Sequence, residues 1–491
     1  MPSIQSIGVG SGLDASSIIS SLMAIERQPL QRLQSAAADV KTQISAYGTL
    51  RAKVDALGSA ADALASAESW SQTTVNLNGN DALKVTASAS AQPLDLDVSV
   101  TALAQRQSIA TSTLPTPLPS MTGTLTIALG AWSAGFGSFS AKSPASSVNV
   151  TIASGDSLVD IRNKINDQPN AGVTASILND ASGSRLVLRS KETGEENGFQ
   201  ITSDDPSLKP LEFNETSLAS RSNTYPVGHP QAGVLDSTDD YGFIANVRGT
   251  NLQATVNGAA VSSASNTMNN VLDGVSIQAL KTTGGSAQVS IGRDLAGMKS
   301  RVDSFVAAYN DFMSYVKQQT AYNADTKTAA TLQGDRVAVG LQYNLRSTIT
   351  GATQASSVFE RLSSVGVELQ PDGSLKTNAA KLDTALQNLP EVAALFSRNE
   401  TGTAQDGVAR RMADLVDQLT GSEGPLKTRQ DSLQERLKRN QTEQEKVNDR
   451  LLQVEARLQA QYTTLDRKMA SLTGLGQYVA QQVQQFSKGQ S

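Results

Sequence analysis

The 491-residue sequence contains no cysteine and only one histidine, and both shortages limit the chemistry it can perform. Without cysteine the chain can form no disulfide, thiol nucleophile or thiolate metal site. The single histidine, His229, lies beside Pro230 in a loop and cannot by itself complete a histidine-based zinc site. A solvated side chain is the simpler interpretation of His229, so we expect no Ser-His-Asp or Cys-His arrangement.

Aromatic residues make up 4% of the chain and charged residues 18%, the latter below the ~25% of an average soluble domain. The formal net charge of −5 provides no electrostatic reason to expect a nucleic-acid partner. No apolar run approaches the length of a membrane span, so we expect no membrane insertion. The first residues also lack a basic stretch followed by an apolar one, which predicts either a cytoplasmic location or a dedicated export route.

Two short motifs could suggest an enzyme, but neither has the surroundings that its chemistry needs. Asp236, Asp239 and Asp240 could in principle bind calcium or serve a glycosidase. Their spacing matches no EF-hand loop, and this stretch offers few aromatic platforms, which favours a solvated acidic loop. The glycines of residues 8–12 precede a helix, but no strand precedes them, which argues against a nucleotide site. We therefore expect no enzyme, no cofactor and no metal.

Heptad repeats at the two ends of the chain are the strongest pattern in the sequence. Between Leu426 and Leu472, apolar residues alternate at spacings of three and four, with polar positions at Asn440 and Gln444. A stripe this narrow needs a partner helix, and the same spacing recurs from Leu33 to Leu64. We predict that helices from the two ends pack together. Two unrelated amphipathic helices, each on a local core, remain the alternative.

The apolar period changes from 3.6 to 2 near Ser71 and returns to 3.6 at Asp294, which predicts helix, then strands, then helix. Asp335 is expected to cap a helix, and residues 379–396 to form one helix bent at Pro390. The C-terminal helix is expected to give way to a short separate piece after Gly474 and Gly476. Residues 203–242 are irregular in pattern. The fold predicted is multidomain α+β, with antiparallel β-rich domains inserted into a helical stem.

Several motifs, in order along nearly the whole chain, resemble those of one family. These are "GVGSGLD" (8–14), "LMAIERQPLQRL" (22–33), "QISAYGTL" (43–50) and "LQGDRVAVGLQYNLRSTI" (332–349). "GDSLVDIRNKIN" (155–166) resembles the flagellin hook IN motif. Together they resemble the flagellar filament cap proteins, the FliD or hook-associated protein 2 family. Residues 203–242 match nothing in that pattern.

The resemblance implies a division into four parts. Residues 1–40 and 430–491 would form a terminal coiled-coil domain, and 41–72 with 293–429 a helical leg domain. Residues 73–108 with 243–292 would form one β-rich head domain. Residues 109–242 would form an outer β-rich head domain that contains the hook IN motif.

The resemblance also implies a function. Members of this family leave the cell through the flagellar export channel and form a ring-shaped homo-oligomer at the distal tip of the filament, where exported flagellin folds and inserts. The implied partners are further copies of the chain, flagellin, hook–filament junction proteins and a cytoplasmic export chaperone, without any cofactor. We expect subunit and filament contacts along the apolar stripes, at Leu22, Ile25, Leu33, Val40, Leu437, Val447, Leu451, Val454, Leu458, Leu465 and Leu472.

Two other functions compete with a filament cap. A junction protein would share the terminal heptads but should lack "ISAYGTL" (44–50) and the inserted hook IN motif. A surface adhesin would concentrate its function in the β-rich heads and should survive deletion of both termini.

Overall fold

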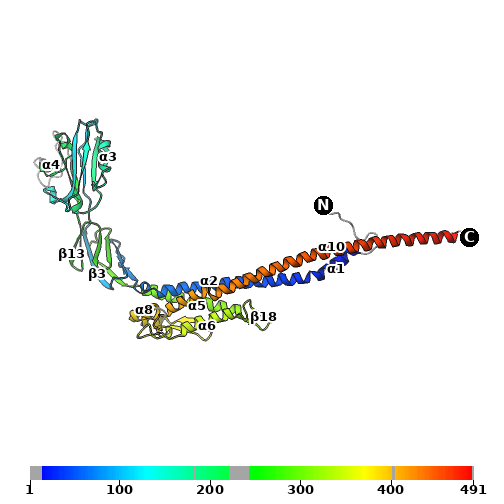
Figure 1. Cartoon of the computed structure of the whole chain (residues 1–491). Helices are drawn as coiled ribbons and strands as arrows, with labels where there is room; N and C mark the ends of the chain where they lie inside the picture. The colour runs from blue at the N-terminus through cyan, green and yellow to red at the C-terminus, as the bar shows by residue number, and fades with distance from the viewer. Residues whose placement is uncertain (1–13, 182, 220–242, 401–403, 489–491) are drawn as a thin grey trace. The chain divides into compact units, whose positions relative to one another are not determined.

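The chain folds into two compact units, Met1–Trp70 with Leu295–Ser491 and Ser71–Asp294. The structure, a computed structural model, describes residues 14–181, 183–219, 243–400 and 404–488. The first unit is largely helical and the second is built of antiparallel sheets (Figure 1). The predicted order of helix, strands and helix is therefore confirmed, as is the α+β class. The finer division into four domains stays a prediction.

Two helices begin the first unit, and Arg27 separates them. Helix α1 (Ala15–Glu26) starts behind Asp14, whose carboxylate accepts a hydrogen bond from the backbone N–H of Ser17 at 3.0 Å. Helix α2 (Gln28–Ala65) restarts with Pro29 in its first turn, where a missing N–H breaks no helical hydrogen bond. Pro29 therefore lies where one helix ends and the next begins.

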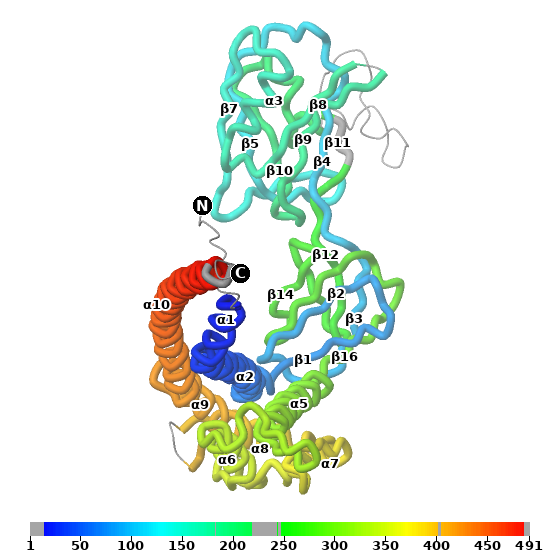
Figure 2. The backbone as a smooth tube through the Cα atoms, turned by 90° about the vertical axis from the view of Figure 1, so that its right-hand side faces the viewer, coloured from blue at the N-terminus to red at the C-terminus, as the bar shows by residue number. Residues whose placement is uncertain are grey.

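Helix α10 (Pro425–Lys488) forms the C-terminal side of the same unit and lies beside α2, with α1 packed further along it (Figures 1 and 2). The sequence predicted an end near Gly474, but α10 continues through Gly474 and Gly476 to Lys488. A glycine costs a helix about 1 kcal/mol relative to alanine. Two glycines between good helix formers weaken the helix without ending it.

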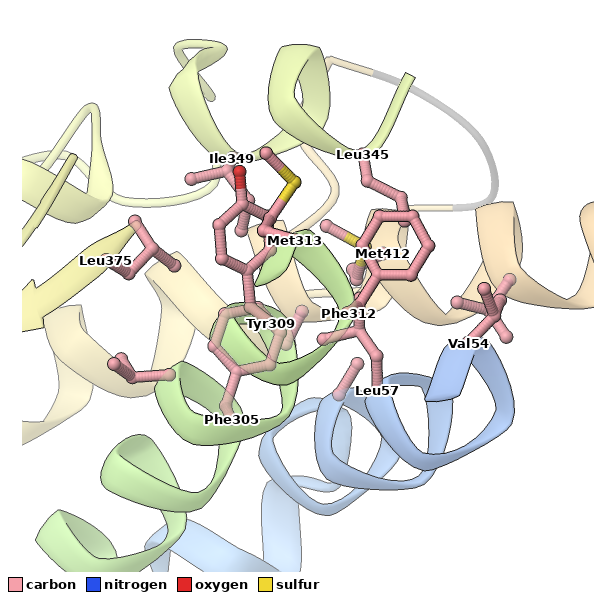
Figure 3. Packing of buried hydrophobic residues seen from close by; sticks show 14 of the residues in the cluster. Val54, Leu57, Phe305, Tyr309, Phe312, Met313, Leu345, Ile349, Leu375 and Met412 are labelled. Atoms are coloured by element: carbon pink, nitrogen blue, oxygen red, sulfur yellow. The ribbon is translucent and has the colours of Figure 1, made fainter. Parts of the chain in front are cut away.

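The core of the first unit lies where α2 meets α5 (Leu295–Thr320), α6 (Arg336–Thr350) and α9 (Val408–Thr420). Large side chains of α5 enter it at every turn. Phe312 lies among residues of α2 and α9, and Tyr309 points toward Ile349 of α6 (Figure 3). The apolar period of 3.6 that returns at Asp294 therefore forms the buried face of α5 from Met298 to Val316, whereas Leu295 is exposed.

The connection between α6 and α9 differs from the expected single bent helix. It consists of α7 (Ala379–Ala385), a 3-10 turn η6 (Leu386–Asn388) and α8 (Leu389–Ser397), because Pro390 begins a new helix instead of bending an old one. The remaining short elements are η1 (Ala67–Trp70), β17 (Tyr322–Asn323), β18 (Thr328–Ala329), η5 (Leu362–Val365), β19 (Val367–Leu369) and β20 (Leu375–Thr377). The last two pair in antiparallel orientation as a hairpin.

One part of the second unit packs a five-stranded sheet, in the order β1-β16-β3-β12-β13, with a three-stranded sheet, β14-β15-β2, around one apolar core. The strands are β1 (Thr73–Asn76), β2 (Leu83–Ala87), β3 (Leu94–Ala102), β12 (Leu252–Val256), β13 (Ala259–Ser263), β14 (Thr267–Leu272), β15 (Val275–Ala279) and β16 (Ala287–Arg293). The alternating apolar pattern of these segments places one face of each sheet in the core.

The other part of the second unit surrounds a separate core with two four-stranded sheets. Its elements are β4 (Ser108–Thr111), β5 (Gly123–Trp132), η2 (Ala134–Phe136), β6 (Phe139–Ala141), β7 (Ser147–Ile152), α3 (Leu158–Asn166), β8 (Val173–Asp180), β9 (Gly183–Ser190), η3 (Glu195–Asn197), β10 (Gly198–Ser203), η4 (Pro206–Leu211), α4 (Glu215–Ala219) and β11 (Phe243–Val247). The last two helical elements occupy part of the stretch that was expected to be irregular. Residues 220–242 lie outside the described part.

Candidate assembly surface

A small apolar cluster joins α1 to α10 and is separate from the core of the first unit. Ile19 and Met23 of α1 pack against Leu451 and Val454 of α10. Half-buried side chains complete the cluster: Leu30, Val447, Leu458 and Tyr462. The predicted pairing of helices from the two ends of the chain is present, and the narrow heptad stripe of α10 forms one side of it.

A polar layer lies between this cluster and the larger core. The Gln444 side-chain amide donates to the Asn440 side-chain oxygen at 2.6 Å and to the backbone oxygen of Leu33 at 3.5 Å. Elsewhere on α2, the side-chain oxygen of Gln43 is buried without a hydrogen-bond partner. Such a layer contributes little stability, but it disfavours shifted registers, in which these amides would face apolar neighbours.

The structure brings together some of the predicted interaction residues and leaves others exposed. Val40, Leu451 and Val454 are buried in the first unit. Four further residues are half-buried: Leu33, Leu437, Val447 and Leu458. The remaining four are exposed in a single chain: Leu22 (38%), Ile25 (62%), Leu465 (42%) and Leu472 (60%).

Sequence reasoning missed the face of α1 that packs against α10. That face consists of Ala15, Ile19 and Met23, which follow one another at intervals of four residues. This spacing is a helical signal, but the stripe of Ile18, Leu22 and Ile25 is equally apolar, so periodicity alone does not choose between them.

Two apolar stripes consequently remain uncovered in the described chain. Ile18, Leu22 and Ile25 line the outer side of α1, each with more than a third of its side chain exposed. The end of α10 presents Leu465, Leu472, Leu475, Tyr478, Val479 and Val483. Contiguous exposed apolar side chains on a regular helix mark a surface that binds another protein.

A hydrogen-bonded carboxylate fixes the base of α10 to the rest of the unit. Asp335 accepts a hydrogen bond from the Tyr47 hydroxyl of α2 at 2.6 Å and one from Arg429 of α10 at 2.9 Å, and it also caps α6. Burial raises the pKa of Asp335, but hydrogen bonds from Tyr47, Ala338 and Arg429 and the charge of Arg429 outweigh burial and hold this pKa below its usual value. Burial, followed by the nearby carboxylate, raises the pKa of Tyr47. One side chain thus links three helices.

These contacts form a packing surface between helices of the first unit. In the described ranges, no group of three or more His, Cys, Asp or Glu residues could hold a metal ion. None of the helices described there is long and apolar enough to cross a membrane. His229, the three aspartates of residues 236–240 and the glycines of residues 8–12 fall outside those ranges.

Comparisons with known protein families agree along most of the chain. Residues 11–107 match the model described as "Flagellar hook-associated protein 2 N-terminus", and residues 249–474 match "Flagellar hook-associated protein 2 C-terminus". Residues 137–192 match the "Flagellin hook IN motif". These matches include the outer stripe of α1 and helix α10 as far as residue 474, whereas Leu475, Tyr478, Val479 and Val483 lie beyond them.

Individual relatives match over nearly their full lengths. The B-type flagellar hook-associated protein 2 of Pseudomonas aeruginosa is 28% identical, with 95% of each chain covered. The flagellar hook-associated protein 2 of Escherichia coli K12 is 28% identical, with 99% of each chain covered. Among solved structures, the D1-D2-D3 domains of the flagellar cap protein FliD from Escherichia coli share the fold at a TM-score of 0.57 and 23% identity, covering 79% of this chain and 99% of that one.

Proposed function

The chain belongs to the flagellar hook-associated protein 2 family, and on this premise we propose that it caps the distal tip of the bacterial flagellar filament. In this role it promotes the folding and insertion of exported flagellin and prevents flagellin from escaping into the medium. The role is structural, with no covalent reaction and no cofactor. It places the protein outside the cell, at the tip of the flagellum.

The observation that carries this proposal is the apolar surface that one chain leaves uncovered at its stem. Helix α10 runs past α1 with a row of exposed apolar side chains, and α1 presents a second row outward. Burying a leucine side chain stabilises a contact by roughly 1.5–3 kcal/mol, so these rows favour association with other helices. Further copies of the chain, flagellin and the hook–filament junction proteins are the proposed axial partners.

We assign the eleven predicted interaction residues two tasks within this surface. Those buried or half-buried in the seam hold the stem helices together, and Leu458 is an example. The exposed ones, such as Leu22 and Leu472, contact neighbouring subunits. Before export, a cytoplasmic chaperone is proposed to cover the same exposed row.

The test replaces Leu458 with aspartate in a flagellated strain that lacks its own cap gene. The variant places a carboxylate in the apolar cluster, at a cost on the order of 2 kcal/mol, and separates α1 from α10. We expect few filaments by electron microscopy and flagellin monomers in the medium. The matched control is Leu452→Asp, because Leu452 is 66% exposed and lies outside the cluster. We expect this control to support normal filaments.

Export of each variant is measured by immunoblotting of the medium, since a variant that stays in the cell would also make no filaments. Normal filaments from an exported Leu458→Asp variant would contradict the proposal. The proposal would also fail if the two leucine variants were equally defective.

A further inference from the structure

Helix α6 has an outward face whose composition is unusual for a solvated surface. Its inner face is buried in the core through Ala338, Leu341, Leu345 and Ile349. Outward, Tyr343 is 73% exposed and Val339 is 49% exposed. Arg336, one turn before Val339, and Arg346, one turn after Tyr343, are also exposed. Tyrosine and arginine are the residues most enriched in protein interfaces, and their spacing of three and four places these four on one stripe, called here the α6 stripe.

The two arginines of the α6 stripe are not neutralised by the carboxylate next to them in the chain, because Asp335 is bonded to Tyr47 and Arg429. Within the described residues, neither Arg336 nor Arg346 forms an ion pair. Helix α6 contains no Asp or Glu between Arg336 and Thr350. A partner for this surface should therefore present carboxylates around an area that can accept an aromatic ring.

A surface of opposite charge occurs on other helices of the same unit. Asp62 of α2 lies near Asp414 and Asp417 of α9, and this group is called here the acidic face. Asp414 pairs with Arg410 at 3.2 Å, whereas Asp62 and Asp417 form no ion pair among the described residues. Burial, and then the charge of Asp417, raise the pKa of Asp62, with Arg410 opposing them. A cation from outside would relieve this repulsion.

The helices that pack against both α2 and α6 define where the two surfaces lie within the unit. Helices α5 and α9 each contact α2 on one side and α6 on another. Figures 1 and 2 both show α6 on the side of these helices away from α2. The α6 stripe and the acidic face are thus different patches of one unit, and complementary patches of this kind join copies head to tail.

We propose that the α6 stripe of one copy docks on the acidic face of a second copy. Arg346 and Arg336 would pair with Asp417 and Asp62, and the ring of Tyr343 would be buried between them. Such a contact repeats from copy to copy, which closes a ring or extends a helix according to the rotation. The inference rests on the self-association in the proposed function and adds a leg-to-leg contact to the contacts of the stem.

Because the chain contains no cysteine, single introduced cysteines can report this contact without background. We choose Ser347→Cys, one turn from Tyr343, and Gln418→Cys, beside Asp417, since both positions are exposed and neither removes a charge of the proposed contact. The two full-length variants, with tags of different mass, are mixed and treated with a short bis-maleimide. We expect a cross-link between the two variants and none within either variant alone. Gln387→Cys, an exposed position on η6, replaces Gln418→Cys as the control and should not cross-link.

The second measurement is the strength of self-association after the charges at Arg346 and Asp417 are reversed. Arg346→Glu and Asp417→Arg should each weaken self-association about ten-fold in sedimentation, because like charges then meet across the contact. The double variant R346E/D417R should restore it. Circular dichroism checks that each variant is folded, and recovery in the double variant excludes a general loss of structure as the cause.

The outcomes separate the inference from the proposed function. Self-association without the Ser347–Gln418 cross-link, or without any response to the charge exchange, would overturn the α6 contact and leave the cap function in place. Cross-linking only between two copies of the Ser347→Cys variant would also overturn it, because that result requires a two-fold contact. A chain that stays monomeric at every concentration would overturn this inference and remove the self-association on which the cap function depends.

Discussion

At the scale of single residues, two tyrosines in the core of the first unit differ in how their hydroxyl groups are satisfied. The Tyr47 hydroxyl donates to Asp335 at 2.6 Å, whereas the Tyr309 hydroxyl is buried without a partner. Burial raises the pKa of Tyr309 to about 12, with Arg346 opposing it. A buried polar group without a partner costs free energy that a hydrogen-bonded one does not.

This difference predicts opposite effects of the same substitution. Tyr309→Phe removes an unsatisfied hydroxyl and should raise the free energy of unfolding by about 1 kcal/mol. Tyr47→Phe removes a hydrogen bond to a carboxylate and should lower it by roughly 1–3 kcal/mol. Urea unfolding followed by circular dichroism measures both. Equal destabilisation by the two variants would show that the Tyr309 hydroxyl has a partner in solution.

Asp335 predicts how this network responds to pH. Its folded-state pKa is lower than its unfolded value, which is about 3.9, so its contribution is present above about pH 4 and is lost as the pH falls through the folded pKa. Asp335→Asn should therefore lower the free energy of unfolding by roughly 2 kcal/mol at pH 7, and the difference should shrink below about pH 4. Urea unfolding at pH values from about 3 to about 7 measures the difference.

The control for Asp335 is Asp431→Asn, which removes an exposed partner of Lys427 on the surface of α10. Exposed ion pairs contribute roughly 0–1 kcal/mol, so this variant should change stability little at any pH. A gap between wild type and Asp335→Asn that grows on acidification would contradict the assigned direction of the pKa shift.

At the scale of elements, the packing of α2 against α9 depends on a glycine. A Cβ atom added at Gly58 of α2 would lie 2.6 Å from a methyl carbon of Val416 in α9, whereas one added at Gly48 would meet nothing within 4 Å. Because both glycines are in α2, comparing alanine substitutions at the two positions separates the effect of helix propensity from the effect of packing.

We expect Gly48→Ala to raise the free energy of unfolding by about 0.5–1 kcal/mol through helix propensity alone. Gly58→Ala should lower it by roughly 1–3 kcal/mol, because α2 must move away from α9. Thermal unfolding of both variants measures the difference. Val416→Ala combined with Gly58→Ala should recover part of the loss, and stabilisation by Gly58→Ala alone would show that the pair is looser than the structure indicates.

At the scale of the whole molecule, the second unit begins and ends on neighbouring strands. Thr73 of β1 pairs with Arg293 of β16, so the chain enters and leaves this unit at one edge of the five-stranded sheet. Each of its two cores is formed by residues of the unit itself. A domain inserted in this way keeps its ends together without the helices that flank it.

We therefore predict that a fragment of residues 71–294 folds without either terminus. Circular dichroism should show a β-rich spectrum and a cooperative thermal transition. A shorter fragment of residues 80–286, which lacks both β1 and β16, should melt at a lower temperature because the five-stranded sheet loses two strands at one edge. A disordered spectrum from the longer fragment would contradict the boundary that the contacts indicate.

Local pattern in the sequence was sufficient to predict most elements and their order. The change of apolar period near Ser71 and Asp294 marks the two limits of the second unit. Asp14 and Asp335 begin helices because a carboxylate satisfies free N–H groups of a first turn. These effects act within a few residues, so they can be read without knowing what packs nearby.

What only the tertiary structure decided is which apolar face meets which partner. Helix α1 has two apolar stripes, and contact with Leu451 and Val454 selects the one that contains Ile19 and Met23. The same applies to Asp335, whose bonds to Tyr47 and Arg429 join residues far apart in the chain. The α6 stripe becomes visible only once the other face of α6 is known to be buried. The sequence by itself determined periods and caps because these depend on neighbouring residues. The choice between faces depends on distant residues, whose proximity folding alone establishes.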